Sequence, residues 1–277
     1  MSLEAAAAPI IEHYGTEDLT ARVAEALGRA GLDRQPLAWS ELAPLDQFHV
    51  RGLAATAELA AGLELAPGAT VLDVGCGLGG PARHLAAEFG AQVTGIDLSQ
   101  PFVDVARMLA ERCGLGDRVQ YRQADALDLP FADASFDHAW TQHVAMNIAD
   151  RAGFYRNIHR VLKPGGRLAI YDIVAGAVEP VIYPVPWARR PEISHLLTGE
   201  AMAAALRQAG FQELAWADRT DLGIAWYREQ AARVPAQAPG LGLPVVMGPE
   251  FPGMFANLGR NLVEGRVRLV QTILRSV

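Results

Sequence analysis

Short apolar runs alternate with longer amphipathic stretches through the middle of the chain. The apolar runs have the length of strands, and the stretches between them repeat their apolar residues at the 3.6-residue spacing of a helix. We therefore predict strands at Thr70–Val74, Gln92–Ile96, Val119–Arg122, Phe136–Thr141, Arg167–Ile173 and Glu213–Ala217. Between them we predict helices at Pro81–Phe89, Pro101–Arg112, Arg151–Leu162 and Gly199–Ala209.

Strands that are separated by crossover helices run parallel, and the helices then cover both faces of the sheet. The pattern thus predicts an α/β fold with a doubly wound, mostly parallel sheet. A seventh strand at Val267–Leu274 follows from its β-branched residues, and we expect it to lie antiparallel at the sheet edge. Two further helices, at Leu19–Ala30 and Asp46–Leu63, precede the first strand.

Composition excludes several classes of function. Hydrophobic residues make up 51% of the 277 residues and charged residues 20%, which is typical of a folded domain. The net charge is -7 and no run of Lys and Arg is long enough for a nucleic-acid footprint. The sequence shows neither a signal peptide nor an apolar run of about 18 residues, so we expect a cytoplasmic protein without a membrane span. No spacing of His, Cys or acidic residues predicts a metal site.

The sharpest motif is the run VLDVGCGLGG at residues 71–80, where an apolar strand enters a glycine-rich turn before a helix. Glycines let the backbone approach a ligand closely. Gly75, Gly77 and Gly80 also satisfy the dinucleotide fingerprint, and Asp97 ends the next strand, where its carboxylate can accept hydrogen bonds from a ribose. An NAD(P)-dependent oxidoreductase is therefore a genuine alternative.

Two acidic residues favour a different cofactor. Asp73 ends the first strand, where it could face a cationic amine or the amides of the turn, but would repel a pyrophosphate. Asp125 follows the third strand and could accept a hydrogen bond from an adenine amino group.

Four segments in order resemble the class I S-adenosylmethionine-dependent methyltransferases: VLDVGCGLGG, GIDLS, QADALDLPF and VLKPGGRL. The segment LDQFHVRG at residues 45–52 is similar to one in the sarcosine/dimethylglycine and ubiquinone-type small-molecule enzymes. The resemblance implies S-adenosylmethionine as the cofactor and S-adenosylhomocysteine as its product. It covers roughly residues 65–217.

The resemblance also implies roles for individual residues. Gly75, Gly77 and Gly79 would line the methionine side of the cofactor, with Asp73, Gln142 and His143 nearby. Asp97 would hold the ribose, Leu98 would lie beside the adenine, and Asp125 and Ala126 would meet the adenine edge.

A single domain, 1–277, is expected to carry these elements in four regions. They are an N-terminal helical lid at 1–64, a cofactor-binding core at 65–174, a substrate lid at 175–198 and a helical insertion at 221–265 before the last strand. Long excursions of this kind often form lids or binding loops. We predict substrate contacts at Tyr14, Met146, Tyr171, Tyr183 and Trp187.

His143 directly follows the fourth strand, and open α/β sheets bind ligands at the carboxyl ends of their strands. Its imidazole is therefore our candidate general base for a small-molecule methyl transfer to N or O rather than C; a simple pocket wall is the alternative. A non-catalytic module that binds S-adenosylmethionine remains the other alternative. We expect a small-molecule acceptor, no nucleic-acid partner and possibly a homodimer.

Overall fold

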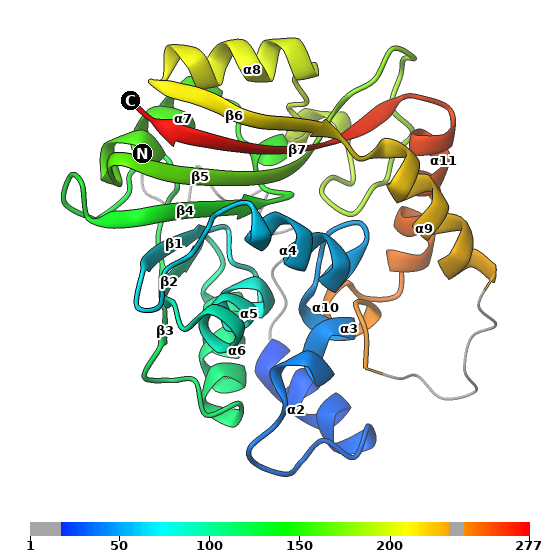
Figure 1. Ribbon diagram of the computed structural model, residues 1–277. Helices are drawn as coiled ribbons and strands as arrows, with labels where there is room; N and C mark the ends of the chain where they lie inside the picture. The colour runs from blue at the N-terminus through cyan, green and yellow to red at the C-terminus, as the bar shows by residue number, and fades with distance from the viewer. Residues whose placement is uncertain (1–17, 233–240) are drawn as a thin grey trace.

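The computed structural model describes residues 18–232 and 241–277 (Figure 1). It contains one seven-stranded sheet in the order β3-β2-β1-β4-β5-β7-β6. The strands are β1 Thr70–Val74, β2 Gln92–Asp97, β3 Val119–Gln123, β4 Phe136–Gln142, β5 Leu162–Ala175, β6 Phe211–Asp218 and β7 Val267–Ser276. β7 runs antiparallel to β5 and β6, and the other neighbouring pairs are parallel, which confirms the predicted fold class. One detail was wrong: β7 lies inside the sheet and β6 forms the edge.

Helices cover both faces of the sheet (Figure 1). They are α2 Leu19–Arg29, α3 Ala43–Asp46, α4 Gly52–Ala61, α5 Gly80–Phe89, α6 Gln100–Arg112, α7 Arg151–Val161, α8 Gly199–Gln208, α9 Thr220–Ala232, α10 Pro244–Met247 and α11 Phe251–Val263. Short 3₁₀ turns lie at η1 Trp39–Leu42, η2 Ala145–Asn147 and η3 Pro191–Ile193.

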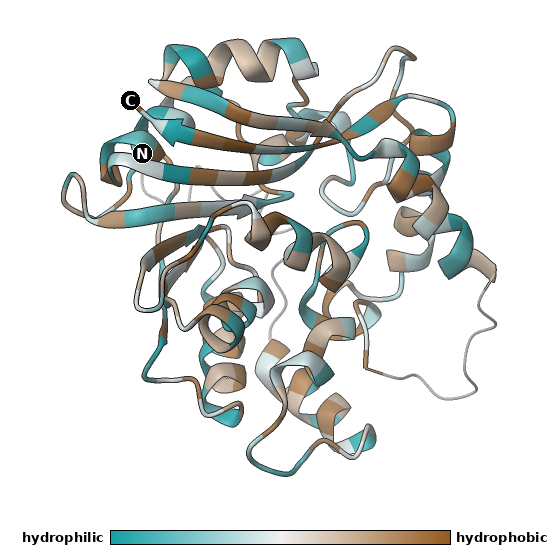
Figure 2. Ribbon diagram, in the orientation of Figure 1, coloured by the Kyte–Doolittle hydropathy of each residue, from teal (hydrophilic) through white to brown (hydrophobic). Residues whose placement is uncertain are grey.

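Successive side chains of a strand point to opposite faces of the sheet, so each face of the sheet has its own part of the hydrophobic core. Val71 packs with residues of α4, α5 and α6, whereas the next residue, Leu72, packs with residues of α7 and α8. Both side chains are fully buried. In Figure 2 the middle of β7 is hydrophobic, while the outer turns of α9 are hydrophilic. The continuous apolar runs in the sequence therefore account for central strands such as β1 and β5, which are buried on both faces.

The predicted helix Asp46–Leu63 was wrong in its continuity. Residues 47–51 leave the helix, and Arg51 and Gly52 adopt positive φ angles of 70° and 49°. The polar side chain of Gln47 accepts a hydrogen bond from Thr56, at 2.6 Å, and this contact holds the chain in the bend. The bend directs the 43–52 segment toward the carboxyl ends of the strands, where it contributes to a cavity.

Candidate active site

A cavity of about 840 Å³ opens at the carboxyl ends of β1, β2 and β4. Ten residues predicted from the sequence line it: Gly75, Gly77, Asp97, Leu98, Asp125, Ala126, Gln142, His143, Met146 and Trp187. Its size is within the range of about 300–1,000 Å³ that is usual for small-ligand sites. The topology therefore brings together residues that are far apart in the sequence.

The glycine-rich turn is shaped by its first glycine. Gly75 has a φ of +74°, and a Cβ atom there would lie 2.3 Å from the side chain of Val144. The amides of Gly75 and Cys76 both donate to the carbonyl oxygen of Ile96, at 2.8 and 2.9 Å. The turn is thus fixed against β2, and its backbone forms part of the cavity wall.

Asp97 lies where a ribose-binding acid is expected. Its Oδ2 accepts a hydrogen bond from the Gly77 amide and its Oδ1 one from the Ser99 amide, each at 2.9 Å. Burial raises the pKa of Asp97 above its usual value. Each carboxylate oxygen can accept more than one hydrogen bond, so both can also receive hydroxyl donors from a ligand.

Asp125 presents a similar acceptor on the other side of the turn. Its Oδ1 accepts from the Leu127 amide at 2.8 Å, and the residue lines the cavity next to Ala126. This local hydrogen bond orients the carboxylate. The arrangement suits an adenine amino group.

Asp73 does not line the cavity: it is buried beneath the turn, with 2% exposure. Its Oδ2 has no hydrogen-bond partner among the described residues. Burial, and then the charge of Asp97, raise the pKa of Asp73 to about 8. At pH 7 this carboxyl group is therefore mostly protonated and uncharged, and its role toward the cofactor stays a prediction from the sequence.

Three other predicted residues, all among the described ones, do not line the cavity. Gly79 is excluded because it packs against Tyr121, whose hydroxyl oxygen would lie 2.2 Å from a Cβ atom. Tyr171 is fully buried behind His143, and Tyr183 is half-buried against the core. Tyr14 lies outside the described residues. The cavity lining thus gives no support to Gly79, Tyr171 and Tyr183 as ligand contacts, and these assignments stay predictions from the sequence.

His143 has an unusual conformation at the end of β4. Its φ is 52°, and its amide donates to the carbonyl oxygen of Tyr171 at 2.8 Å. The imidazole stacks on the Tyr171 ring, with centroids 5.2 Å apart. Its Nε2 is buried and has no partner in the part of the chain that the structure describes. Burial, and then the proximity of His49, lower the pKa of His143 well below its usual value, so the ring is neutral.

His49 is a cavity residue that the sequence analysis did not assign to the site. Its Nε2 lies 3.0 Å from the Gly52 carbonyl oxygen and 2.9 Å from Thr56 Oγ1. A carbonyl can only accept, so Nε2 carries the proton. Its ring centroid is 6.0 Å from that of His143, and burial lowers its pKa to about 4. The LDQFHVRG segment at residues 45–52 is the sequence signal that could have identified His49, because the bend in this segment brings His49 to the cavity.

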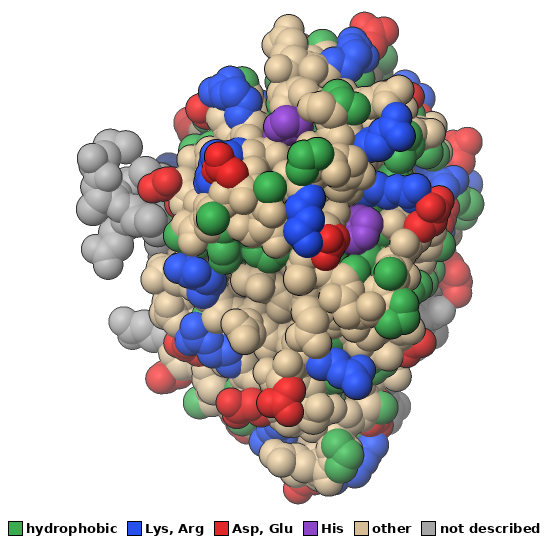
Figure 3. Space-filling model, turned by 60° about the vertical axis from the view of Figure 1, so that its left-hand side comes forward, with side chains coloured by type: hydrophobic (Ala, Val, Ile, Leu, Met, Phe, Trp, Pro, Cys, Tyr) green, Lys and Arg blue, Asp and Glu red, His purple; other side chains and the backbone are tan. Residues whose placement is uncertain are grey.

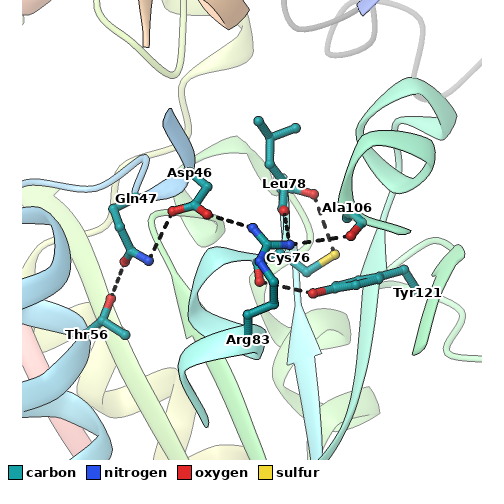
Figure 4. Close-up of polar contacts among 10 residues, drawn as sticks. Asp46, Gln47, Thr56, Cys76, Leu78, Arg83, Ala106 and Tyr121 are labelled. Carbon is teal, nitrogen blue, oxygen red and sulfur yellow. Dashed lines mark hydrogen bonds and ion pairs between the residues drawn. The ribbon is translucent and has the colours of Figure 1, made fainter. Parts of the chain in front are cut away.

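A buried polar network holds the 43–52 segment (Figure 4). The carboxylate of Asp46 pairs with the Arg83 guanidinium at 2.6 Å, and both side chains are essentially inaccessible to solvent. Arg83 also donates to the carbonyl oxygen of Leu78 in the glycine-rich turn, at 2.8 Å. From Asp46 the contacts continue through Gln47 to Thr56. The network therefore joins the cofactor turn to the segment that carries His49.

Gln142 completes the inner wall of the cavity. Its Oε1 accepts a hydrogen bond from Trp140 Nε1 at 3.1 Å, which fixes the orientation of the amide. Its Nε2 then faces away from Trp140 and, within the described ranges, has no partner. Buried polar atoms are normally satisfied. The unpaired Nε2 atoms of Gln142 and His143 therefore fit a polar ligand that is held between the strand ends.

A methyltransferase-domain family model matches residues 72–170. The methyltransferase GfsG of Streptomyces halstedii is 43% identical over 136 residues, which is 49% of each chain. The O-methyltransferase resE of Aspergillus sclerotiorum is 37% identical over 66% of this chain and 70% of its own. The chain thus spans about half the length of GfsG and more than two thirds of resE.

Solved structures have a similar fold. The [4+2]-cyclase SpnF has a TM-score of 0.64 and 28% identity over 80% of both chains. A geranyl diphosphate C-methyltransferase from Streptomyces coelicolor A3(2), in complex with S-adenosyl-L-homocysteine, has a TM-score of 0.71 and 18% identity over 100% of this chain and 99% of its own. A putative sarcosine dimethylglycine methyltransferase from Galdieria sulphuraria has a TM-score of 0.65 and 21% identity, over 80% and 82%.

The last two structures are less than 25% identical to this chain, so they show a common fold only. The sequence relatives show the family. The relatives, the glycine-rich turn and the strand-end acids at the cavity together identify the methyl donor of this family. The chain belongs to the class I methyltransferases that use S-adenosylmethionine.

Proposed function

We propose that this protein transfers the methyl group of S-adenosylmethionine to a hydroxyl oxygen of a small acceptor. One observation carries the choice of oxygen: a neutral imidazole, His143, lies at the cavity with a buried and unpaired Nε2. A hydroxyl group must lose its proton when its oxygen is methylated, and a neutral imidazole can accept that proton.

Bound S-adenosylmethionine supplies an electrophilic methyl group. Gly75, Gly77, Asp97 and Asp125 are proposed to hold this cofactor, since all four line the cavity. The chain's remaining task is to keep the acceptor oxygen in line with the methyl group, to exclude water and to take up the hydroxyl proton. We assign the last step to His143 Nε2.

The second candidate is a role without methyl transfer. The cyclase SpnF has 28% identity and a similar fold, so this architecture supports more than one activity. An NAD(P)-dependent oxidoreductase receives no support from the relatives described above, which are methyltransferases.

Turnover separates the two candidates. The purified protein is incubated with S-adenosylmethionine and with matched phenols, alcohols and amines, and formation of S-adenosylhomocysteine is measured. Product formation with hydroxyl acceptors, lost in His143→Ala, is the expected result. Binding of the cofactor without turnover of any acceptor would support the second candidate, and turnover of amines only would contradict methylation at oxygen.

No helix of the described residues is both long and apolar enough to cross a bilayer. On the face in Figure 3, Lys and Arg side chains lie among Asp and Glu. The cytoplasmic location, the homodimer and the lack of a nucleic-acid partner remain proposals from the sequence.

A further inference from the structure

The charges around the cavity are all of one sign. Its charged lining residues are Asp97, Asp125, Asp150 and Glu192, and the described part of the lining contains no Lys or Arg. A phosphate or carboxylate that enters such a cavity loses its hydration without gaining a cationic partner, which is costly. The described residues also form no group of three His, Cys, Asp or Glu side chains that could hold a metal ion to neutralise it.

The acids are not placed to receive a cationic acceptor either. Asp97 and Asp125 belong to the strand ends assigned to the cofactor. Asp150 caps α7, where its Oδ1 accepts a hydrogen bond from the Gly153 amide at 2.8 Å. Glu192 is exposed in the η3 turn. The inner acceptor side of the cavity is therefore without a free carboxylate.

Aromatic and aliphatic side chains form the rest of the acceptor side. Trp226 of α9 and Phe255 of α11 meet edge to face, with centroids 5.8 Å apart, and both line the cavity. Trp187 faces the same cavity, and its position is fixed because its Nε1 donates to Ser194 Oγ at 2.9 Å. Its carbonyl oxygen accepts from Asn147 at 2.7 Å. This wall is rigid and apolar.

We infer that the acceptor is an uncharged, largely apolar compound with one hydroxyl group. The inference rests on the proposed function, because the hydroxyl is the group that meets His143. The apolar body lies against Trp187, Trp226 and Phe255. This class differs from the geranyl diphosphate that is bound in one structure of the C-methyltransferase from Streptomyces coelicolor A3(2).

The test uses three phenols that differ only in the end of a pentyl chain: 4-pentylphenol, its terminal carboxylate and its terminal trimethylammonium analogue. Binding to the protein saturated with S-adenosylhomocysteine is measured by calorimetry. We expect the neutral phenol to bind at least about tenfold more tightly than either charged analogue, since each charge would be buried without a partner. Equal or tighter binding of a charged analogue, or no binding of 4-pentylphenol at millimolar concentration, would overturn the inference.

Two variants locate the contact. Trp226→Ala should weaken binding of 4-pentylphenol at least about fivefold and leave the affinity for S-adenosylhomocysteine unchanged. Leu222→Ala, on the exposed side of the same helix, is the control and should change neither. An unchanged affinity in Trp226→Ala would contradict the proposed wall. Methyl transfer is scored separately: if 4-pentylphenol binds but is not methylated, the methylation of hydroxyl groups fails while the acceptor class stands.

Discussion

The two cavity histidines are neutral for a physical reason that the sequence does not show. Burial lowers the pKa of His49 to about 4 and that of His143 well below its usual value. Each ring is therefore in its neutral form throughout the neutral range, and each is a weaker base than a free imidazole. The proton of His49 is fixed on Nε2 by the Gly52 carbonyl, whereas the described residues do not fix the tautomer of His143.

His143→Ala should lower turnover at least about tenfold, because a positioned base contributes about 10²–10⁴-fold. The affinity for S-adenosylhomocysteine should change little. Since the pKa of His143 is depressed, the acidic limb of the wild-type rate profile should lie below pH ~6.5, with a nearly flat rate from pH 7 to 9. Steady-state kinetics across pH measure this. A His143→Gln variant with near wild-type turnover would show that the ring only forms the wall.

The raised pKa of Asp73 predicts that the free energy of unfolding depends on pH. Its pKa is raised to about 8 in the folded protein and is about 3.9 in the unfolded chain. Between these values the folded state binds more protons, so this residue makes the free energy of unfolding fall as the pH rises. Asp73→Asn removes the effect, so the free energy of unfolding of the variant minus that of wild type should be larger at pH 8 than at pH 5, by at least about 1 kcal/mol. Denaturant titrations at both pH values test this; a pH-independent difference would contradict the raised pKa.

At the scale of elements, the 43–52 segment is fastened to α5 by a buried ion pair. Asp46→Asn leaves Arg83 buried without its charged partner, and loss of one partner of such a pair costs about 3–5 kcal/mol. The control is Glu25→Gln, which removes an exposed pair with Arg29 and should cost less than about 1 kcal/mol. Chemical denaturation compares the two. If Asp46→Asn costs no more than the control, the pair does not anchor the segment.

A second prediction at this scale concerns the glycine-rich turn and its affinity for the cofactor product. Gly75→Ala combines a φ of +74° with a collision against Val144, so the turn must move. We expect the affinity for S-adenosylhomocysteine to fall at least about tenfold. Gly114→Ala has a φ of +67° and no atom within 4 Å, and it is the control for backbone strain alone. Calorimetric affinities close to wild type in both variants would show that this turn does not hold the cofactor.

Much of the fold could be predicted because central strands such as β1 and β5 are apolar and buried on both faces. Strand ends in such a sheet converge, so Asp97, Asp125 and His143 could be placed in one site from the sequence. The helix at 46–63 failed, because helical spacing does not reveal that Gln47 bonds back to Thr56. Motif spacing also cannot show that the Tyr121 side chain fills the space beside Gly79.

At the scale of the whole molecule, segments that precede β1 and segments that follow β5 in the sequence line the cavity. The 43–52 segment, the 175–198 insertion and helices α9, α10 and α11 all contribute lining residues. Asn261 of α11 holds the insertion through two hydrogen bonds with the Ile182 backbone, at 2.8 and 2.9 Å. The acceptor side is thus built from several elements that are fastened to each other, while the sheet supplies the cofactor side.

The central claim is that this fold binds the methyl donor at the strand ends. Calorimetric titration with S-adenosylhomocysteine tests it most directly, in wild type and in Asp97→Ala, with the exposed Asp104→Ala on α6 as control. We predict one-to-one binding in wild type and in Asp104→Ala. In Asp97→Ala the binding free energy should be about 1.5–3 kcal/mol weaker, the scale of hydrogen bonds to a charged group. Binding of NAD in place of S-adenosylhomocysteine, or equal affinities in all three proteins, would contradict the account.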